Sequence, residues 1–405
     1  MGGERTLLEA GSLNKRWPCW IEVDLDAICR NVSSIKRFLN SKCQVMAVVK
    51  SQAYGHGMVP VAKAAVAAGA TWLGVSRVRE GVQLRGSGLD TRILLLGPIA
   101  YAEMPEVVSH KLTPTVVSKD AARLLSESAA AEGLTVPVHI KVDTGLGRFG
   151  APFEEVRELV KEIAALPGLE LEGLYSHFAT ADDEDSSYAK SQLEMFHYVR
   201  RELEGDGFNF RLVHMAASGG TLAVSSSDLD LVRIGLSLYG LYPASHMAGR
   251  VELEPALSMH SSIARVFTLQ PGQSVGYGRT YVASEHTYAA LVPVGYADGL
   301  PRSHSNRGYV LVNGQRAPLI GRISMDQCVV DVSGCGNVRV GDPVVVIGRQ
   351  GEECISCEEF AARSGTINYE VVTSLGYRVP RVYISNGRVV GVGFLDQGRV
   401  EGWCF

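Results

Sequence analysis

A lysine at the end of an apolar run is the first residue whose type and position could do chemistry. Lys50 directly follows the run VMAVV (45–49) and precedes the segment SQAYGHG. Removing such an amine from water lowers its pKa, so that it can act as a nucleophile or form a Schiff base. A lysine at a strand end can also lay its aliphatic stem along apolar neighbours and keep its charge in water. Position alone therefore makes Lys50 a candidate and leaves both interpretations open.

A glycine-rich segment is the second feature with chemical potential. The run GLGRFG (145–150) has the GxGxxG spacing of a dinucleotide-binding turn, follows an apolar run and precedes a helical pattern. Two features count against that interpretation. The segment comes after the fifth predicted strand rather than the first, and it carries Arg148 between its second and third glycines. We therefore interpret the glycines as a tight strand-to-helix turn.

The elements that must position these residues follow from the spacing of apolar side chains. Short runs rich in β-branched residues alternate with longer segments whose apolar residues have helical spacing. Strands that alternate with helices predict a parallel sheet in an α/β protein, and eight strands close a (β/α)8 barrel. A doubly wound open sheet is the competing arrangement. The predicted strands are VMAVV (45–49), TWLGV (71–75), RILLLG (92–97), PTVVS (114–118), VPVHIKV (136–142), LELEGLY (169–175), RLVHM (211–215) and DLVRIGL (230–236).

The pattern changes near residue 250. Beyond it, short strand-like runs are separated by Gly, Pro and Asn, and one short helix is predicted at about 357–364. We therefore predict an N-terminal (β/α)8 barrel over residues 1–250 and a mostly β C-terminal domain over 251–405. The first strand, at about 20–26, is a candidate to pack with the β domain.

Composition excludes several classes of protein. The 405 residues are 46% hydrophobic and 20% charged, as in an ordinary globular protein, and the net charge of −4 gives no basic field for nucleic acid. No apolar stretch is long enough to span a membrane, and the N-terminus lacks the apolar core of a secretory signal. The eight cysteines are scattered, so we predict reduced thiols in the cytoplasm. The lone CxxC at 354–357 has no second ligand pair nearby, so we predict no metal site.

Eight ordered motifs carry a family resemblance that runs from about Trp20 to Tyr383. Together they resemble the alanine racemases, which are pyridoxal 5'-phosphate (PLP) enzymes of fold type III. The resemblance implies a PLP-bearing barrel, a β C-terminal domain, and a head-to-tail homodimer whose subunits share active sites. It also implies interconversion of L- and D-alanine, to supply D-alanine for bacterial peptidoglycan. The motifs are AVVKSQAYGHG, HIKVDTGLGRFG, YSHFATAD, VRIGLSLYG, SVGYGRTY, VPVGYADG, GRISMDQ and LGYRVPRVY.

The resemblance implies two catalytic bases. Racemisation removes a proton from one face of Cα and returns one on the other face, which a single base cannot easily do. The resemblance assigns one face to Lys50, which also holds PLP covalently, and the other to Tyr277 of the partner subunit. Because the free pKa of tyrosine is about 10, the phenol needs help near neutral pH. The resemblance implies that His177 and Arg233 give this help through hydrogen bonds.

The same resemblance implies how the cofactor is held. Arg233 faces the pyridine nitrogen, and because an arginine stays protonated, it cannot give its proton to that nitrogen. The ring is then a weaker electron sink than one paired with a carboxylic acid. Hydroxyl groups and backbone amides suit the phosphate. The implied cofactor-binding residues are Lys50, Tyr54, His177, Ser218, Arg233, Gly235, Leu236 and Tyr377, with Gly235 and Leu236 acting through their backbone.

The substrate contacts are likewise implied by resemblance. Arg148 matches the ligand of the substrate carboxylate, and Met325 is expected to add a backbone N–H. Tyr296 matches a gate that narrows the site together with Tyr377, which favours alanine over larger amino acids. Lys141 matches a lysine that is carbamylated in many family members and orients the arginine; a carbamate would pair with Arg148, whereas an ammonium group would repel it.

Departures from the family pattern leave the exact substrate open. Ala217 stands where an asparagine is usual, so hydrogen bonds near the cofactor are lost, and Ser51-Gln52 replace a pair expected to face away from PLP. A serine or broad-specificity racemase is the nearest alternative. A PLP lyase would want a metal site, and a non-catalytic PLP-binding protein would lack the β domain that carries Tyr277. A barrel with a nucleophilic lysine and no PLP is the remaining alternative.

Overall fold

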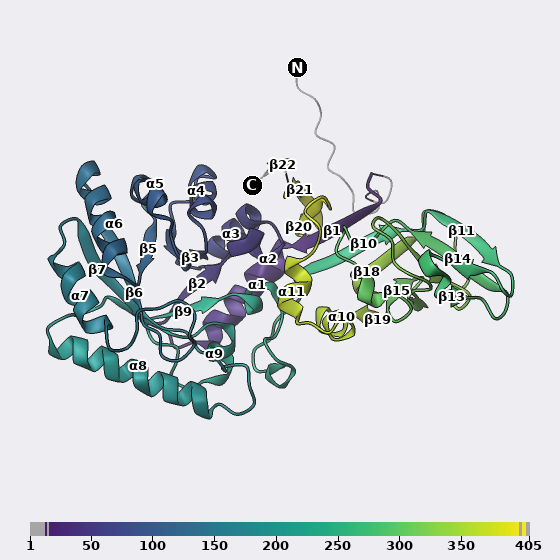
Figure 1. The fold of residues 1–405 in the computed structure, drawn as a ribbon. Coiled ribbons are helices and arrows are strands. Elements are labelled where there is room, and N and C mark those ends of the chain that lie inside the picture. The colour runs from purple at the N-terminus through teal and green to yellow at the C-terminus, as the bar shows by residue number, and fades with distance from the viewer. Residues whose placement is uncertain (1–12, 14–15, 397–398, 402–405) are drawn as a thin grey trace, which may run out of the picture. The chain divides into compact units, whose positions relative to one another are not determined.

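The structure is a computed structural model that describes residues 13, 16–396 and 399–401 (Figure 1). The chain divides into two compact units. We call residues 28–53 and 58–254 the barrel unit. We call the described part of residues 1–27, 54–57 and 255–405 the strand-rich unit.

The barrel unit is built on one parallel sheet of eight strands. Its order is β8-β7-β6-β5-β4-β3-β2-β9, so β2 pairs with both β3 and β9. β8 and β9 stand at the two ends of this order. The N–H of Arg233 in β9 donates to the carbonyl of Ala216, just after β8, at 3.0 Å and so bridges the gap between them. The predicted barrel is confirmed, and all eight predicted strands are present. They are β2 (Gln44–Val48), β3 (Trp72–Val75), β4 (Arg92–Leu95), β5 (Thr113–Val116), β6 (Val136–Lys141), β7 (Leu169–Tyr175), β8 (Leu212–His214) and β9 (Leu231–Ile234).

Helices between the strands lie on the outside of this sheet, as α4 to α8 show in Figure 1. Helix α6 illustrates why they form. The Ser118 hydroxyl accepts the Ala121 N–H at its start, Gly133 ends it with a φ of 63°, and its buried residues recur at helical spacing. The helices are α1 (Leu25–Phe38), α3 (Met58–Ala67), α4 (Val78–Gly86), α5 (Met104–Ser109), α6 (Lys119–Glu132), α7 (Val156–Ala165), α8 (Ser187–Gly205) and α9 (Ser218–Ala223).

The strand-rich unit contains a long mixed sheet and two small ones. In the long sheet, β1 pairs antiparallel with β10 and parallel with β20. The long sheet contains β1 (Cys19–Asp24), β10 (Leu257–Ser262), β15 (Tyr309–Val312), β16 (Gln315–Pro318), β18 (Pro343–Gln350), β19 (Glu353–Ile355), β20 (Arg381–Ser385), β21 (Arg388–Phe394) and β22 (Arg399–Glu401). The small sheets contain β11 (Arg265–Leu269), β14 (Thr287–Val292) and β17 (Cys328–Asp331), and β12 (Ser274–Val275) and β13 (Tyr281–Val282).

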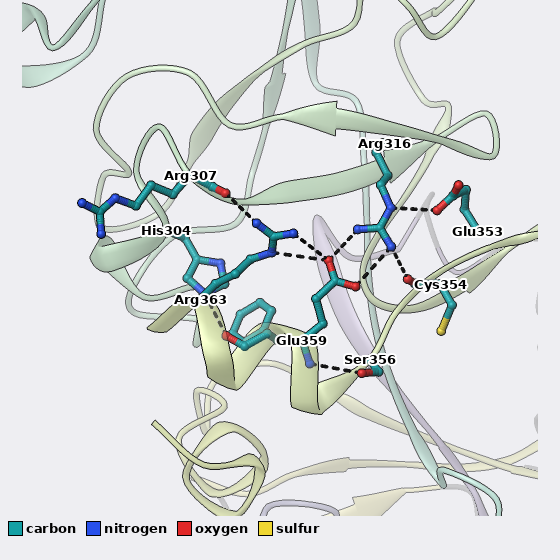
Figure 2. Close-up of polar contacts among 9 residues, drawn as sticks. His304, Arg307, Arg316, Glu353, Cys354, Ser356, Glu359 and Arg363 are labelled. Carbon is teal, nitrogen blue, oxygen red and sulfur yellow. Dashed lines mark hydrogen bonds and ion pairs between the residues drawn. The ribbon is translucent and has the colours of Figure 1, made fainter. Parts of the chain in front are cut away.

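Helix α10 (Cys357–Ser364) confirms the short helix predicted in this half, and α11 (Asn368–Thr373) follows it. The Ser356 hydroxyl accepts the Glu359 N–H at the start of α10. Figure 2 shows how Glu359 ties this helix to the sheet: its carboxylate accepts from Arg316 of β16 at 2.5 Å and from Arg363 one turn later at 3.0 Å. Of the two cysteines of the CxxC segment, Cys354 lies in β19 and Cys357 begins α10. The Cys354 carbonyl accepts from Arg316 at 2.7 Å.

No helix in the part of the chain that the structure describes is long and apolar enough to cross a membrane.

A glycine inside the barrel makes room for a buried imidazole ring. A Cβ added to Gly173 of β7 would lie 2.5 Å from Nδ1 and 2.6 Å from Cγ of His139, on the neighbouring strand β6. His139 is fully buried and cannot turn toward solvent. The position therefore tolerates no side chain while the ring stays where it is.

We predict that Gly173→Ala lowers the free energy of unfolding of the apoprotein by about 1–3 kcal/mol, because the new methyl group overlaps the ring. Chemical denaturation would measure it. Gly205→Ala in α8 is the matched control, since a Cβ there meets nothing within 4 Å. Equal stability of the two variants would contradict the steric argument.

Candidate active site

Eight of the predicted site residues gather at one end of the barrel sheet. Each lies at, or a few residues beyond, the carboxyl end of a strand, where barrel enzymes build their active sites. Lys50 follows β2, Lys141 ends β6, and Arg148 lies in the loop after it. The others are His177 after β7, Ser218 after β8, Arg233 within β9, and Gly235 and Leu236 directly after β9.

Lys50 opens an unusual left-handed turn, α2 (Lys50–Tyr54). Ser51, Gln52, Ala53 and Tyr54 have φ values of 53°, 54°, 52° and 51°, a conformation that residues other than glycine rarely adopt. Four such residues in succession are strained by roughly 1–2 kcal/mol each. Strain of this kind persists only where surrounding contacts fix the backbone, and it often marks a functional site.

Glu80 of α4 supplies one of those contacts. Its carboxylate accepts the Ser51 N–H at 2.6 Å and, with its other oxygen, the N–H groups of Ser76 and Arg77 at 2.7 and 3.0 Å. The Ala53 N–H also donates to the Val49 carbonyl at 2.8 Å. The turn that carries Lys50 is thus tied to the loop after β3.

The amine of Lys50 lies in a setting that favours its neutral form. Burial lowers its pKa, and the positive charge of Arg148 lowers it further, while Glu80 acts in the opposite direction. A neutral amine can attack a carbonyl carbon or accept a proton, and a protonated one can do neither. This supports the chemical interpretation of Lys50 over that of a solvated surface lysine.

The glycine-rich loop holds Arg148 by wrapping around a carboxylate. Asp143 accepts the N–H groups of Gly145, Gly147 and Arg148 at 2.9, 3.1 and 3.2 Å. Although burial raises the pKa of Asp143, these hydrogen bonds bring it below its ordinary value. The amides that would cradle a dinucleotide are therefore already used, as the turn interpretation predicts, and α7 begins only at Val156.

Lys141 is a second buried lysine of the site. Burial, followed by the charges of Arg233 and Arg148, lowers its pKa to about 7. Its Nζ lies 5.4 Å from the ring centre of Phe149 and 5.7 Å from that of Tyr175. A large fraction of Lys141 is therefore uncharged near neutral pH.

Arg233 is the most connected group of the site and is 3% exposed. Its Nη1 donates to His214 Nδ1 at 2.7 Å, and its Nη2 donates to His177 Nδ1 at 2.9 Å. Nη2 also donates to the carbonyls of Ser176 and Met215, each at 2.8 Å. Because a guanidinium can only donate, the Nδ1 of both histidines must accept.

This geometry fixes the tautomer of His177. With Nδ1 accepting, a neutral His177 carries its proton on Nε2, from which it can donate to a further group. Burial and the charges of Arg233 and Lys141 lower its pKa well below the ordinary value, so the ring is neutral. The same burial lowers the pKa of Arg233 to about 10, which leaves the guanidinium charged at neutral pH.

Ser218, Gly235 and Ser237 form a buried polar cluster. The Ser218 hydroxyl accepts the N–H groups of Gly235 and Ser237 at 3.1 and 3.2 Å. The Ser237 hydroxyl is buried and, among the described residues, makes no hydrogen bond. A buried hydroxyl without a partner is costly, so a polar ligand is expected to reach this place. Ala217, next to Ser218, has no side-chain group to provide that partner.

In the strand-rich unit, loops bring together Tyr296, Met325 and Tyr377. The N–H of Tyr296 donates to the Ser324 carbonyl at 3.1 Å, and the N–H of Ala297 donates to the Met325 carbonyl at 3.0 Å. The side chains of these three residues are exposed to solvent.

Arg378, which the sequence analysis did not single out, fastens these loops. It donates to Asp298 at 2.8 Å and to Asp326 at 2.7 Å, and so links the loops that carry Tyr377, Tyr296 and Met325. Asp298 and Arg378 lie within the quoted motifs VPVGYADG and LGYRVPRVY. Their opposite charges were the available signal, but the sequence does not reveal which charges meet.

Tyr277 and Tyr54 also belong to the strand-rich unit. Tyr277 begins a 3-10 turn, η5 (Tyr277–Arg279), flanked by Gly276 and Gly278, and is 71% exposed. The ring of Tyr54 lies 6.3 Å from that of Tyr369.

Comparisons with known proteins agree over nearly the whole chain. Residues 23–243 match the family model of the alanine racemase N-terminal domain, and residues 256–383 match that of the C-terminal domain. A curated alanine racemase of Desulforamulus reducens is 44% identical over 369 residues, which are 91% of this chain and 99% of that relative.

Solved structures share the fold. An alanine racemase from Bacillus anthracis with bound L-Ala-P has a TM-score of 0.88 and 40% identity, over 94% of this chain and 99% of that one. A histidine racemase from Leuconostoc mesenteroides subsp. sake has a TM-score of 0.84 and 28% identity, over 91% of this chain and 99% of that one.

Proposed function

This chain belongs to the alanine racemase family, whose members depend on PLP and interconvert L- and D-alanine, and from that premise we propose how its own residues perform the reaction. Lys50 serves as the base on one face of the substrate Cα, and Tyr277 of a partner subunit serves as the base on the other. The observation that carries the proposal is the hydrogen bond from the buried Arg233 to His177 Nδ1, which leaves the proton of a neutral His177 on Nε2.

The barrel residues fit PLP. The amine of Lys50, whose pKa is lowered by burial, would hold the cofactor covalently. The hydroxyl of Ser218 and the backbone of Gly235 and Leu236 would bind its phosphate with help from Tyr54 and Tyr377. The nearby Ser237 hydroxyl, which has no hydrogen-bond partner within the described part of the chain, supports an anion there. Arg233 would face the ring nitrogen. When bound, PLP supplies the electron-withdrawing ring that makes the Cα proton of an attached amino acid acidic.

Each base is prepared differently for proton transfer. Burial and the charge of Arg148 lower the pKa of Lys50, which increases the share of neutral amine that can accept a proton. The Nε2–H of His177 can donate to a phenol oxygen, which stabilises the phenolate form of tyrosine and lowers its pKa. Arg233 holds His177 in that role, because its own N–H occupies Nδ1.

The substrate carboxylate is proposed to bind Arg148 and the backbone N–H of Met325. A guanidinium pairs well with a carboxylate because two parallel hydrogen bonds fit its geometry. Asp143 holds the backbone at Arg148 and leaves the guanidinium to bind the substrate. Tyr296 and Tyr377 would narrow the entrance, and the Arg378 link to Asp298 would keep that constriction rigid.

A homodimer with shared active sites would account for the exposed position of Tyr277. Its ring is 71% exposed, as expected for a residue that reaches into a second subunit. The two-base reaction also needs a group of this kind opposite Lys50. We therefore propose that the active unit is a dimer and that each subunit contributes its Tyr277 to the site of the other.

We expect PLP-loaded protein to exchange the Cα proton of L- and D-alanine in D2O, with inversion, and serine and larger amino acids far more slowly. Proton NMR would follow both signals. Lys50→Ala, the control, should lose exchange and covalent cofactor attachment together. Equal exchange of serine would support the broad-specificity alternative, for which the similarity to a histidine racemase is a reason to test. No exchange with bound PLP would contradict the proposed function.

We predict that Tyr277→Phe impairs proton abstraction from one enantiomer by about 10²-fold or more, because it removes one acid–base group and leaves Lys50 intact. Measuring Cα exchange separately from L- and D-alanine tests this. Tyr288→Phe, an exposed tyrosine on β14, is the matched control. Equal losses for both enantiomers would overturn the two-base assignment.

We also propose that Lys141 is carbamylated. Its neutral amine adds to CO2, an Nζ–C bond forms, and one proton is released, which leaves an anion close to Arg148 and Arg233. Since the pKa of Lys141 is about 7, the neutral amine predominates above that pH. The carbamate signal in 13C NMR under 13CO2 should therefore grow as the pH rises through about 7 and disappear in Lys141→Ala. A bare amine at pH 8 would contradict the modification.

A further inference from the structure

We propose that Glu172, at the opposite end of the barrel, is a positioning residue for Arg233: it stabilises the tautomers of His139 and His214 in which His214 Nδ1 can accept from Arg233. The inference rests on the proposed role of Arg233 at the cofactor ring. It adds a line of buried polar groups that runs through the interior of the barrel, which the proposed mechanism does not use.

Two hydrogen bonds and one longer polar contact connect the four groups. Arg233 Nη1 lies 2.7 Å from His214 Nδ1, His214 Nε2 lies 2.9 Å from His139 Nδ1, and His139 Nε2 lies 3.5 Å from Glu172 Oε2. The exposures are 3% for Arg233, 0% for both histidines and 1% for Glu172. Water does not compete for any of these contacts.

The two ends of the line impose a single direction on it. Arg233 can only donate, so His214 Nδ1 accepts and the proton of a neutral His214 is on Nε2. That N–H donates to His139 Nδ1, so the proton of a neutral His139 is on its own Nε2 and points at Glu172. Burial, followed by the charge of Arg233, lowers the pKa of His139 to about 3, so the ring is neutral. An ionised carboxylate can only accept, which completes the pattern.

Two arginines fix which oxygen of Glu172 faces His139. Arg92 donates to Oε1 at 2.5 Å, and Arg211 also donates to Oε1, whereas Oε2 makes no hydrogen bond among the described residues and lies 3.5 Å from His139 Nε2. The arginine side chains are 50% and 53% exposed and border a cavity of about 780 Å³, which is lined by the first residues of β4, β5 and β6 and by Glu170 and Glu172 of β7. The amino ends of the strands therefore supply the acceptor that orients the line.

Packing keeps the rings in place. Tyr175 stacks on His214 with ring centres 4.6 Å apart and planes at 8°, and Trp72 lies 5.3 Å from His139. Gly173 leaves the space that the His139 ring fills. Since neither ring can turn aside, a change at one end of the line must appear as a change of tautomer along it.

Glu172→Gln tests this with little change of shape. The amide oxygen of Gln is expected to stay with Arg92 and Arg211, so its NH2 group would face His139 Nε2. Both histidines would then have to carry their protons on Nδ1, and His214 would present an N–H to the N–H of Arg233. We expect Arg233 to be displaced and PLP affinity to fall about tenfold, equivalent to about 1.4 kcal/mol.

Nitrogen-15 NMR of the apoprotein reads the tautomers directly. In the unchanged protein both buried histidines should be protonated on Nε2, and in Glu172→Gln on Nδ1. Glu172→Asp keeps an acceptor at this place and should retain the Nε2 tautomers. Glu170→Gln, an exposed carboxylate on the same strand, is the matched control and should change neither tautomers nor PLP affinity. If Glu172→Gln fails to fold, Glu172→Asp still tests the inference: protonation of both histidines on Nδ1 in that variant, which keeps an acceptor, would overturn it.

The outcomes separate this inference from the proposed function. Unchanged tautomers in a folded Glu172→Gln would overturn the inference and leave the racemase assignment intact. Inverted tautomers without any loss of PLP affinity would overturn the claim that Glu172 acts on Arg233. Inverted tautomers with reduced PLP affinity would support the inference, even if Tyr277→Phe contradicted the two-base assignment.

Discussion

The buried guanidinium of Arg233 is the interaction on which the rest of the site depends. Four acceptors surround it: two imidazole nitrogens and two carbonyl oxygens. A buried charge is tolerated only when its hydrogen bonds are complete, so these partners must stay where they are. Because an arginine has donors only, the requirement propagates outward. His177 is left with its proton on the far nitrogen, and His214 is left donating deeper into the barrel.

The fold supplies this rigidity at strand ends. His177 and Ser218 follow neighbouring strands, so a single closed sheet sets the spacing of groups far apart in the chain. The strained turn after Lys50 orients the amine at the end of β2, where an unstrained loop would otherwise be sufficient to continue the chain. Glu80 offsets part of that strain by binding three backbone N–H groups at once. Rigidity and strain therefore occur in the same small region, as is common where catalytic geometry is imposed.

The sequence predicted the architecture because hydrophobic periodicity reports on local structure. All eight barrel strands and the helix at 357–364 follow from that pattern, and the family resemblance supplied candidate residues. What could not be predicted are contacts that depend on long-range geometry. Nothing local in the sequence shows that two arginines and a histidine converge on Glu172. Likewise, the positive φ values at Ser51–Tyr54 occur without a glycine, so no residue type announces the turn.

The charges of the site explain which ligands it suits. The charge of Arg148 lowers the pKa of Lys50, the charges of Arg233 and Arg148 lower the pKa of Lys141, and Asp143 is engaged by backbone amides. Such a group of cations is costly unless anions enter it. A cofactor phosphate, a substrate carboxylate and a carbamate on Lys141 would each reduce that cost. The apoprotein site is therefore poised for anions, and ligand binding relieves a repulsion that the folded barrel maintains.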